Sequence, residues 1–196
     1  MATDPKSPGV LKPGDPAPEI QLTTEAGQPF QLSDLRGKNV VLYFYPKADT
    51  PGCTTEACEF RDDARTLWRY GAEIVGVSPD PVSALAKFRS KYSLPFTLLA
   101  DTEHAAAEAY GVWKEKSMYG KTYMGVERTT FVIDRQGRQR VLMRSDFAPA
   151  DLTANLRALI FVPTTDGRLG PGATETTRFT LTLEDGFAPA VVNSAT

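Results

Sequence analysis

The chain has 196 residues, of which 41% are hydrophobic and 23% charged, which is enough apolar material for one packed core. Its net charge of −2 gives no basic field that would attract nucleic acid or an anionic membrane surface. No apolar run approaches the roughly 20 residues that span a bilayer, and the first residues lack the apolar stretch of about 7–15 residues of a secretory signal. We therefore expect a cytoplasmic protein that binds neither nucleic acid nor membrane.

The hydrophobic periodicity alternates between strand and helix patterns along most of the chain. Residues 1–17 are rich in proline and glycine and predict a loose lead-in, with folded structure beginning near Pro18. The expected elements, in chain order, are strands at 20–22 and 30–32 that form a small hairpin, a strand at 39–45, a helix at 53–70, a strand at 73–78, a helix at 81–92, a strand at 96–99, a helix at 103–110, strands at 125–134 and 139–144 joined by a turn at 135–138, and a closing helix at 149–160.

This order of elements predicts an α/β fold with helices on both faces of a sheet. The run NVVLYFY at 39–45 is apolar and β-branched throughout, as expected of a central strand. A thioredoxin-like α/β sandwich with a central mixed sheet fits these elements.

The domain organisation follows from the same patterns. We expect a flexible N-terminal lead-in at 1–11, one folded domain at 12–161 and a C-terminal extension at 162–196. The extension carries eight threonines and four glycines, a composition that favours disorder over a docked strand or arm.

Only two cysteines occur, five residues apart and within one predicted helix. In a reducing compartment such a pair is more typical of transient catalysis than of a structural staple. Thr50 is a suitable N-cap and Pro51 is favoured at the first helical position, so Cys53 falls in the first turn. The exposed N–H groups and the helix dipole at that end stabilise a thiolate.

The two thiols occupy different faces of the predicted helix. The residues that share the face of Cys53 are Ala57, Phe60, Ala64, Leu67 and Trp68. Cys58 lies about 140° away, and in an intact helix the two Cα atoms would be about 8.6 Å apart, beyond the roughly 7 Å limit for a disulfide. A disulfide between them would require the first turns to unwind.

Other interpretations of the cysteines remain open from their spacing alone. Both are suited to be small apolar core residues. A thiol–disulfide oxidoreductase on the same fold usually carries Cys-x-x-Cys, which is absent. A copper-binding assembly protein would need a histidine beside paired cysteines, whereas His104 lies in a polar helical stretch and is expected at the surface. A structural zinc site needs four ligands, so we expect no metal.

The segment FYPKADTPGCTTEACEFRD resembles the active-site signature of the bacterioferritin-comigratory-protein, or Q-type, peroxiredoxins. The likeness continues in GDPAP at 14–18, VGVS at 75–78 and GVERTTFVID at 125–134, so it extends over about residues 12–160. It implies a thioredoxin-like fold, a thiol peroxidase that acts on hydrogen peroxide and organic hydroperoxides, and no cofactor.

The resemblance also implies roles for five residues. Cys53 aligns with the peroxidatic cysteine and Cys58 with the resolving cysteine. Thr50 aligns with the active-site threonine, Pro46 with the proline that shields the thiolate, and Arg128 with the family arginine, whose guanidinium would donate hydrogen bonds to the peroxide. The implied reaction passes through a Cys53 sulfenic acid and a Cys53–Cys58 disulfide that thioredoxin or a similar dithiol reduces.

The partners implied are a hydroperoxide substrate and a dithiol reductant, and we expect a monomer or weak homodimer. A peroxide sensor that passes its oxidation to a client protein would need no change in sequence. Sustained peroxide turnover with catalytic thioredoxin distinguishes the two.

Overall fold

The computed structural model describes residues 11–69, 71–118 and 121–144. The expected closing helix and the C-terminal extension lie outside the described residues. The elements, in chain order, are β1 (Gln21–Thr24), β2 (Pro29–Gln31), a 3-10 helix η1 (Leu32–Leu35), β3 (Asn39–Phe44), α1 (Pro51–Arg69), β4 (Ala72–Ser78), α2 (Val82–Tyr92), β5 (Thr97–Ala100), α3 (Ala105–Ala109), β6 (Trp113–Met118), β7 (Lys121–Val126), β8 (Thr129–Ile133) and β9 (Gln139–Arg144). None of the helices in these ranges combines the length and apolarity that a membrane crossing requires.

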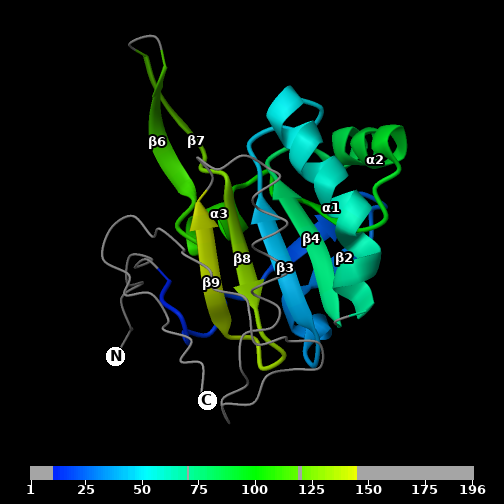
Figure 1. The fold of residues 1–196 in the computed structure, drawn as a ribbon. Helices are drawn as coiled ribbons and strands as arrows, with labels where there is room; N and C mark the ends of the chain where they lie inside the picture. The colour runs from blue at the N-terminus through cyan, green and yellow to red at the C-terminus, as the bar shows by residue number, and fades with distance from the viewer. Residues whose placement is uncertain (1–10, 70, 119–120, 145–196) are drawn as a thin grey trace, which may run out of the picture.

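A seven-stranded mixed sheet forms the centre, in the order β2-β1-β5-β4-β3-β8-β9 (Figure 1). Strands β3, β4 and β5 run parallel, and β8 pairs antiparallel with β3. Alternate side chains of β3 enter two separate apolar clusters, Val41 and Tyr43 on one face and Val40 and Leu42 on the other. Helices α1 and α2 cover the first face and α3 covers the second, as the mixed α/β prediction required (Figure 1).

The ends of four strands meet at one edge of this sheet. The parallel strands β3, β4 and β5 finish there, and β8 begins there because Phe44 pairs with Thr129. The loop after β3 and the residue before β8 are therefore neighbours, although more than 70 residues separate them in the chain. Helix α1 also starts at this edge (Figure 1).

The expected strand at 125–134 is wrong, because the chain forms two strands there. Strand β7 ends at Val126 and pairs with β6, whereas β8 begins at Thr129 and joins the central sheet. The difference follows burial: all five residues of β8 are buried, whereas β7 is exposed along most of its length. The β6–β7 pair projects as a ribbon beyond the sheet (Figure 1).

The expectation that folded structure begins near Pro18 is also wrong. The N–H of Gly14 donates to the carbonyl of Gln139, and the N–H of Ala17 donates to the carbonyl of Gly137. Ala17 is buried. The backbone N–H groups of this proline- and glycine-rich segment are thus hydrogen-bonded to the β8–β9 hairpin. The segment packs along the hairpin without forming a regular strand.

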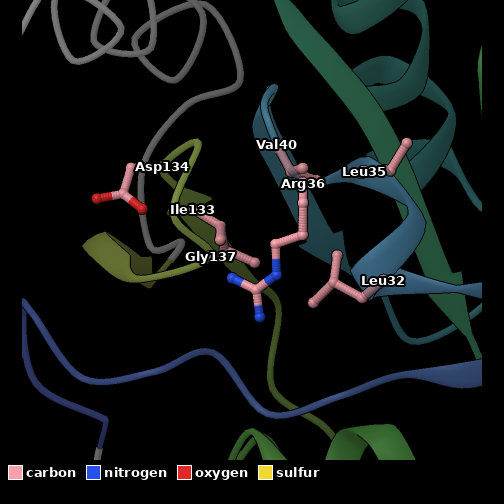
Figure 2. Close-up of a pocket in the computed structure, with 7 residues that line it drawn as sticks. All are labelled: Leu32, Leu35, Arg36, Val40, Ile133, Asp134 and Gly137. Carbon is pink, nitrogen blue, oxygen red and sulfur yellow. The ribbon is translucent and has the colours of Figure 1, made fainter.

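A small hollow lies at the opposite end of the sheet (Figure 2). Its lining residues are Leu32, Leu35, Arg36, Val40, Ile133, Asp134 and Gly137. The guanidinium of Arg36 donates to the carbonyl of Gln136 and occupies the space that a Cβ on Gly137 would need. The hollow lies at the end of the sheet opposite to the start of α1 and is lined by neither cysteine.

Candidate active site

The loop between β3 and α1 is fixed to the end of the neighbouring strand. The N–H of Ala48 donates to Asp80 Oδ2 over 2.7 Å, and the same oxygen accepts from the hydroxyl of Ser78 over 2.6 Å. Because Ser78 ends β4, the position of the loop depends on the parallel pairing of β3 and β4. The polar contacts satisfy a buried backbone group where the strand leaves the sheet.

Thr50 and Pro51 begin the helix as the sequence predicts. Helix α1 starts at Pro51, and the carbonyl of Thr50 accepts from the N–H of Thr54 over 2.8 Å. The hydroxyl of Thr50 donates to the carbonyl of Lys47 over 2.9 Å, which closes the loop on itself. Pro46 is exposed, so its role as a shield for the thiolate stays a prediction, as does the role of Thr50 in the reaction.

Cys53 lies in the first turn of α1 and is only 2% exposed. Arg128, immediately before β8, donates from Nη2 to Cys53 Sγ over 3.0 Å. The strand ends described above bring these two residues together across the sheet edge. A charged donor at this distance stabilises negative charge on its acceptor.

Glu56 is a member of this site that the sequence interpretation missed. It is 2% exposed and accepts a hydrogen bond from Arg128 Nη1. Burial raises the pKa of Glu56 to about 7, against the lowering effect of Arg128. The sequence does hold a sign of its role, because Glu56 is a lone carboxylate three residues after Cys53 on a helix face that is otherwise apolar.

Arg128 therefore bridges two groups that both carry negative charge when ionised. One nitrogen contacts Glu56 and another contacts Cys53, and the side chain of Arg128 is 23% exposed. The carboxylate holds the guanidinium in a fixed orientation, because the planar fork of arginine contacts two partners at once. The sulfur thus faces a positioned cation.

Aromatic side chains form the apolar wall behind Cys53. Tyr43 and Tyr45 belong to the same buried cluster as Cys53, and their ring centroids lie 5.3 Å apart. Burial raises the pKa of both phenols well above the ordinary value, so they stay neutral. In the described part of the chain the hydroxyl of Tyr43 has no hydrogen-bond partner. The charged group that contacts the sulfur is the guanidinium of Arg128.

Cys58 lies on the same continuous helix, and both cysteines are free. Cys53 is buried and Cys58 half-buried, as expected for opposite faces. Of the predicted apolar face, Phe60 and its neighbours are buried, but Trp68 is 39% exposed. Trp68 lies in the last turn and at the margin of that face, which accounts for its exposure.

His104 is half-buried and not the free surface residue that we expected. Its ring stacks on Trp113, with centroids 3.8 Å apart and planes at 20°. Across residues 11–69, 71–118 and 121–144 no group of three histidine, cysteine, aspartate or glutamate side chains is arranged to hold a metal ion.

Comparisons with known proteins identify the family of this chain. The AhpC/TSA family profile matches residues 13–141. Peroxiredoxin Bcp of Bacillus subtilis is 54% identical over 125 residues, which is 64% of this chain and 80% of that protein. Peroxiredoxin Bcp of Escherichia coli is 46% identical over 128 residues, which is 65% of this chain and 82% of that protein.

Solved structures of peroxiredoxins have a similar fold. Peroxidoxin BcpB from Mycobacterium tuberculosis superposes with a TM-score of 0.69 at 38% identity, covering 76% of this chain and 96% of that one. The bacterioferritin comigratory protein of Xanthomonas campestris, described by its alkyl peroxide reduction activity, gives 0.68 at 36% identity, covering 71% of this chain and 89% of that one. These matches confirm the thioredoxin-like fold. The chain belongs to the AhpC/TSA family and is a peroxidase of its Bcp/PrxQ peroxiredoxin group.

Proposed function

We propose that this chain reduces hydroperoxides with the thiolate of Cys53, forms an intramolecular disulfide with Cys58, and is recycled by thioredoxin or a similar dithiol protein. The observation that carries the proposal is the hydrogen bond of 3.0 Å from Arg128 to the sulfur of Cys53 at the start of a helix. The alkyl peroxide reduction described for the Xanthomonas relative supports organic hydroperoxides as substrates beside hydrogen peroxide.

In the first step the Cys53 thiolate attacks one oxygen of the peroxide. A sulfur–oxygen bond forms, the O–O bond breaks, and the second oxygen takes up a proton and leaves as water or an alcohol. Cys53 is thereby oxidised to a sulfenic acid. Arg128 stabilises the charge that shifts from sulfur to the leaving oxygen, and Glu56 keeps the guanidinium oriented.

Thr50 and Pro46 serve this step through the loop that precedes the helix. The hydroxyl of Thr50 closes the loop by its bond to Lys47, which sets the path of the chain into α1. In this proposal Thr50 positions the peroxide, and Pro46 keeps bulk water from the thiolate.

In the second step the Cys58 thiol attacks the sulfenic sulfur of Cys53. The disulfide forms and one molecule of water leaves. Both residues lie on the unbroken helix α1, where five residues of rise hold their Cα atoms about 8.6 Å apart, beyond disulfide reach. The first turns of α1 must therefore unwind before the bond can close.

In the third step a dithiol reductant attacks the exposed disulfide, and exchange transfers the oxidation to the reductant. Cys53 and Cys58 return to thiols and α1 folds again. The cytoplasm expected from the sequence supplies such reductants.

Steady-state peroxide consumption, coupled to NADPH through thioredoxin and its reductase, tests the proposal. We expect sustained turnover by the unaltered chain and none by Cys53→Ser. Cys58→Ser should consume about one equivalent of peroxide per chain and then stop, with Cys53 left as a sulfenic acid that mass spectrometry identifies after trapping. If the unaltered chain also stops after one equivalent while thioredoxin is present, the chain is a sensor that transfers oxidation to a client.

A further inference from the structure

The C-terminal end of α2 contacts both ends of the segment that must unwind. On the N-terminal side, Lys91 Nζ donates to both carboxylate oxygens of Asp49 over 2.8 Å, and the hydroxyl of Tyr92 donates to Asp49 Oδ1 over 2.6 Å. On the C-terminal side, Arg61 Nη1 donates to the carbonyl of Tyr92 over 3.1 Å. We call the three residues Asp49, Lys91 and Tyr92 the latch.

Asp49 is held in a backbone conformation that favours its release. Its φ of 60° lies in the left-handed region, which is unfavourable for residues other than glycine and only partly tolerated by aspartate. The hydrogen bonds from Lys91 and Tyr92 lower the pKa of Asp49, so the carboxylate is the form that the latch binds. When these bonds open, the loop is free to adopt a more favourable conformation.

The latch acts directly on the first turn of α1. Only Thr50 separates Asp49 from the first helical residue, and the carbonyl of Thr50 accepts the helical hydrogen bond of Thr54. The other anchor of the loop, Ala48 on Asp80, lies one residue earlier and leads back to the sheet. The turn that carries Cys53 therefore keeps its helical position as long as the latch is closed.

We propose that Asp49, Lys91 and Tyr92 are positioning residues that set the rate of the disulfide step: the closed latch keeps Cys53 in the helix and away from Cys58, and its opening lets Cys53 reach Cys58. This inference rests on the proposed function, because it assigns a control to the proposed Cys53–Cys58 disulfide. Tyr92 contributes on both sides, through its hydroxyl to Asp49 and its carbonyl to Arg61.

The latch thereby divides the sulfenic acid between two fates. If the latch opens, Cys58 attacks, the disulfide forms and water leaves. If it stays closed, a second hydroperoxide transfers one oxygen atom to the sulfenic sulfur, which gives a sulfinic acid and an alcohol or water. A tighter latch favours over-oxidation, and a looser one favours the disulfide.

The double variant Lys91→Met and Tyr92→Phe tests this inference, because it removes the donors and leaves Asp49 and the backbone carbonyl in place. Lys87→Met, one turn earlier on the exposed side of α2, is the matched control. Rapid mixing with peroxide, acid quenching and mass spectrometry measure the sulfenic, disulfide and sulfinic forms over time. The double variant loses two solvent-exposed contacts of small free energy, so we expect its disulfide to form about threefold faster than in the unaltered chain. The sulfinic fraction should be smaller, and the rate of Cys53 oxidation should be unchanged.

Further variants separate positioning from general stability. Tyr92→Phe alone should give the same change at smaller size, and Asp49→Asn, which tolerates the left-handed backbone and retains an acceptor for Tyr92, should lie between the unaltered chain and the double variant. If the double variant forms the disulfide at an unchanged rate and Cys53 is oxidised normally, the inference about the latch is wrong, while the proposed function still stands. An unaltered chain that never forms the Cys53–Cys58 disulfide would overturn the proposed function itself.

Discussion

The two halves of α1 are bound to the rest of the molecule by different forces. Residues 51–58 carry Gly52 and two threonines, which are weak helix formers, and contact the sheet edge through the charged pair of Arg128 with Glu56 and Cys53. Residues 59–69 carry a fully buried apolar stripe that packs on the sheet and on α2, formed by Phe60, Ala64 and Leu67.

This difference separates a half that can open from a half that anchors. Hydrogen bonds and ion pairs are exchanged for bonds to water at small net cost, and this half adds only the small side chains of Cys53 and Ala57 to the apolar core. The first half can therefore unwind while the large apolar side chains stay buried. Burial of apolar surface has no such substitute, so the second half cannot leave the sheet. Cys53, the proposed peroxidatic residue, lies in the half with the smaller apolar contact.

The largest effect should come from the anchoring half. Phe60 is fully buried, with its ring 4.7 Å from that of Tyr43. Phe60→Ala should lower the free energy of unfolding by about 3–5 kcal/mol, measured by urea denaturation, because it leaves a cavity. The folded fraction should still react with peroxide at a near-normal rate. A loss below about 1 kcal/mol would show that this half is not the anchor.

The second effect concerns the polar half. Arg128→Met removes the donor to Cys53 and should slow Cys53 oxidation by about 10²–10³-fold, as loss of one charge-stabilising donor does elsewhere. Stopped-flow mixing with peroxide measures the rate, and thermal unfolding measures the stability. Arg128→Lys should be intermediate, because one ammonium cannot contact Glu56 and Cys53 with the same geometry. Equal losses of rate and stability in Arg128→Met would make the residue structural.

Local sequence patterns predicted most of the sheet and the helix that carries the cysteines. The run at 39–45 predicts a strand buried on both faces, and Thr50-Pro51 predicts where α1 begins; the structure has both. These features depend on nearest neighbours in the chain, which periodicity and capping describe well.

The features that the sequence did not reveal depend on long-range register. Glu56 is paired with Arg128, which lies just before β8, and that meeting depends on the pairing of Phe44 with Thr129. Arg128 was proposed from family resemblance and not from its local pattern. The break after Val126 was missed for a similar reason, since only the competition between two sheets decides where β7 ends.

The third effect is a pH dependence that belongs to Glu56. Its pKa is raised from 4.5 to about 7, so the folded chain holds a proton that the unfolded chain releases. The stability from this group is present below pH 4.5 and is lost as the pH rises through about 7. Because one pKa unit corresponds to about 1.4 kcal/mol, Glu56→Gln should gain on the order of 3 kcal/mol relative to the unaltered chain between these limits.

Urea denaturation of both chains across this pH range measures the difference. Glu103→Gln, which changes an exposed carboxylate, controls for the loss of a surface charge. A constant difference between Glu56→Gln and the unaltered chain would mean that Glu56 is ionised throughout, and that its pair with Arg128 outweighs burial.

The smallest effect tests whether the first half must unwind. Gly52→Ala strengthens the helix by up to about 1 kcal/mol, and its Cβ would stand 3.4 Å from Arg128 Nη2, an ordinary contact. Disulfide formation after peroxide should slow by about fivefold, the factor that 1 kcal/mol gives, with more sulfinic acid at high peroxide. Thr66→Ala, a similar strengthening of the anchoring half, should leave the disulfide rate unchanged. Amide hydrogen exchange of the oxidised chain should show new exposure only in the first half of α1, around Cys53 and Cys58. A Cys53–Cys58 bridge found by mass spectrometry with full protection across that segment would refute the unwinding step.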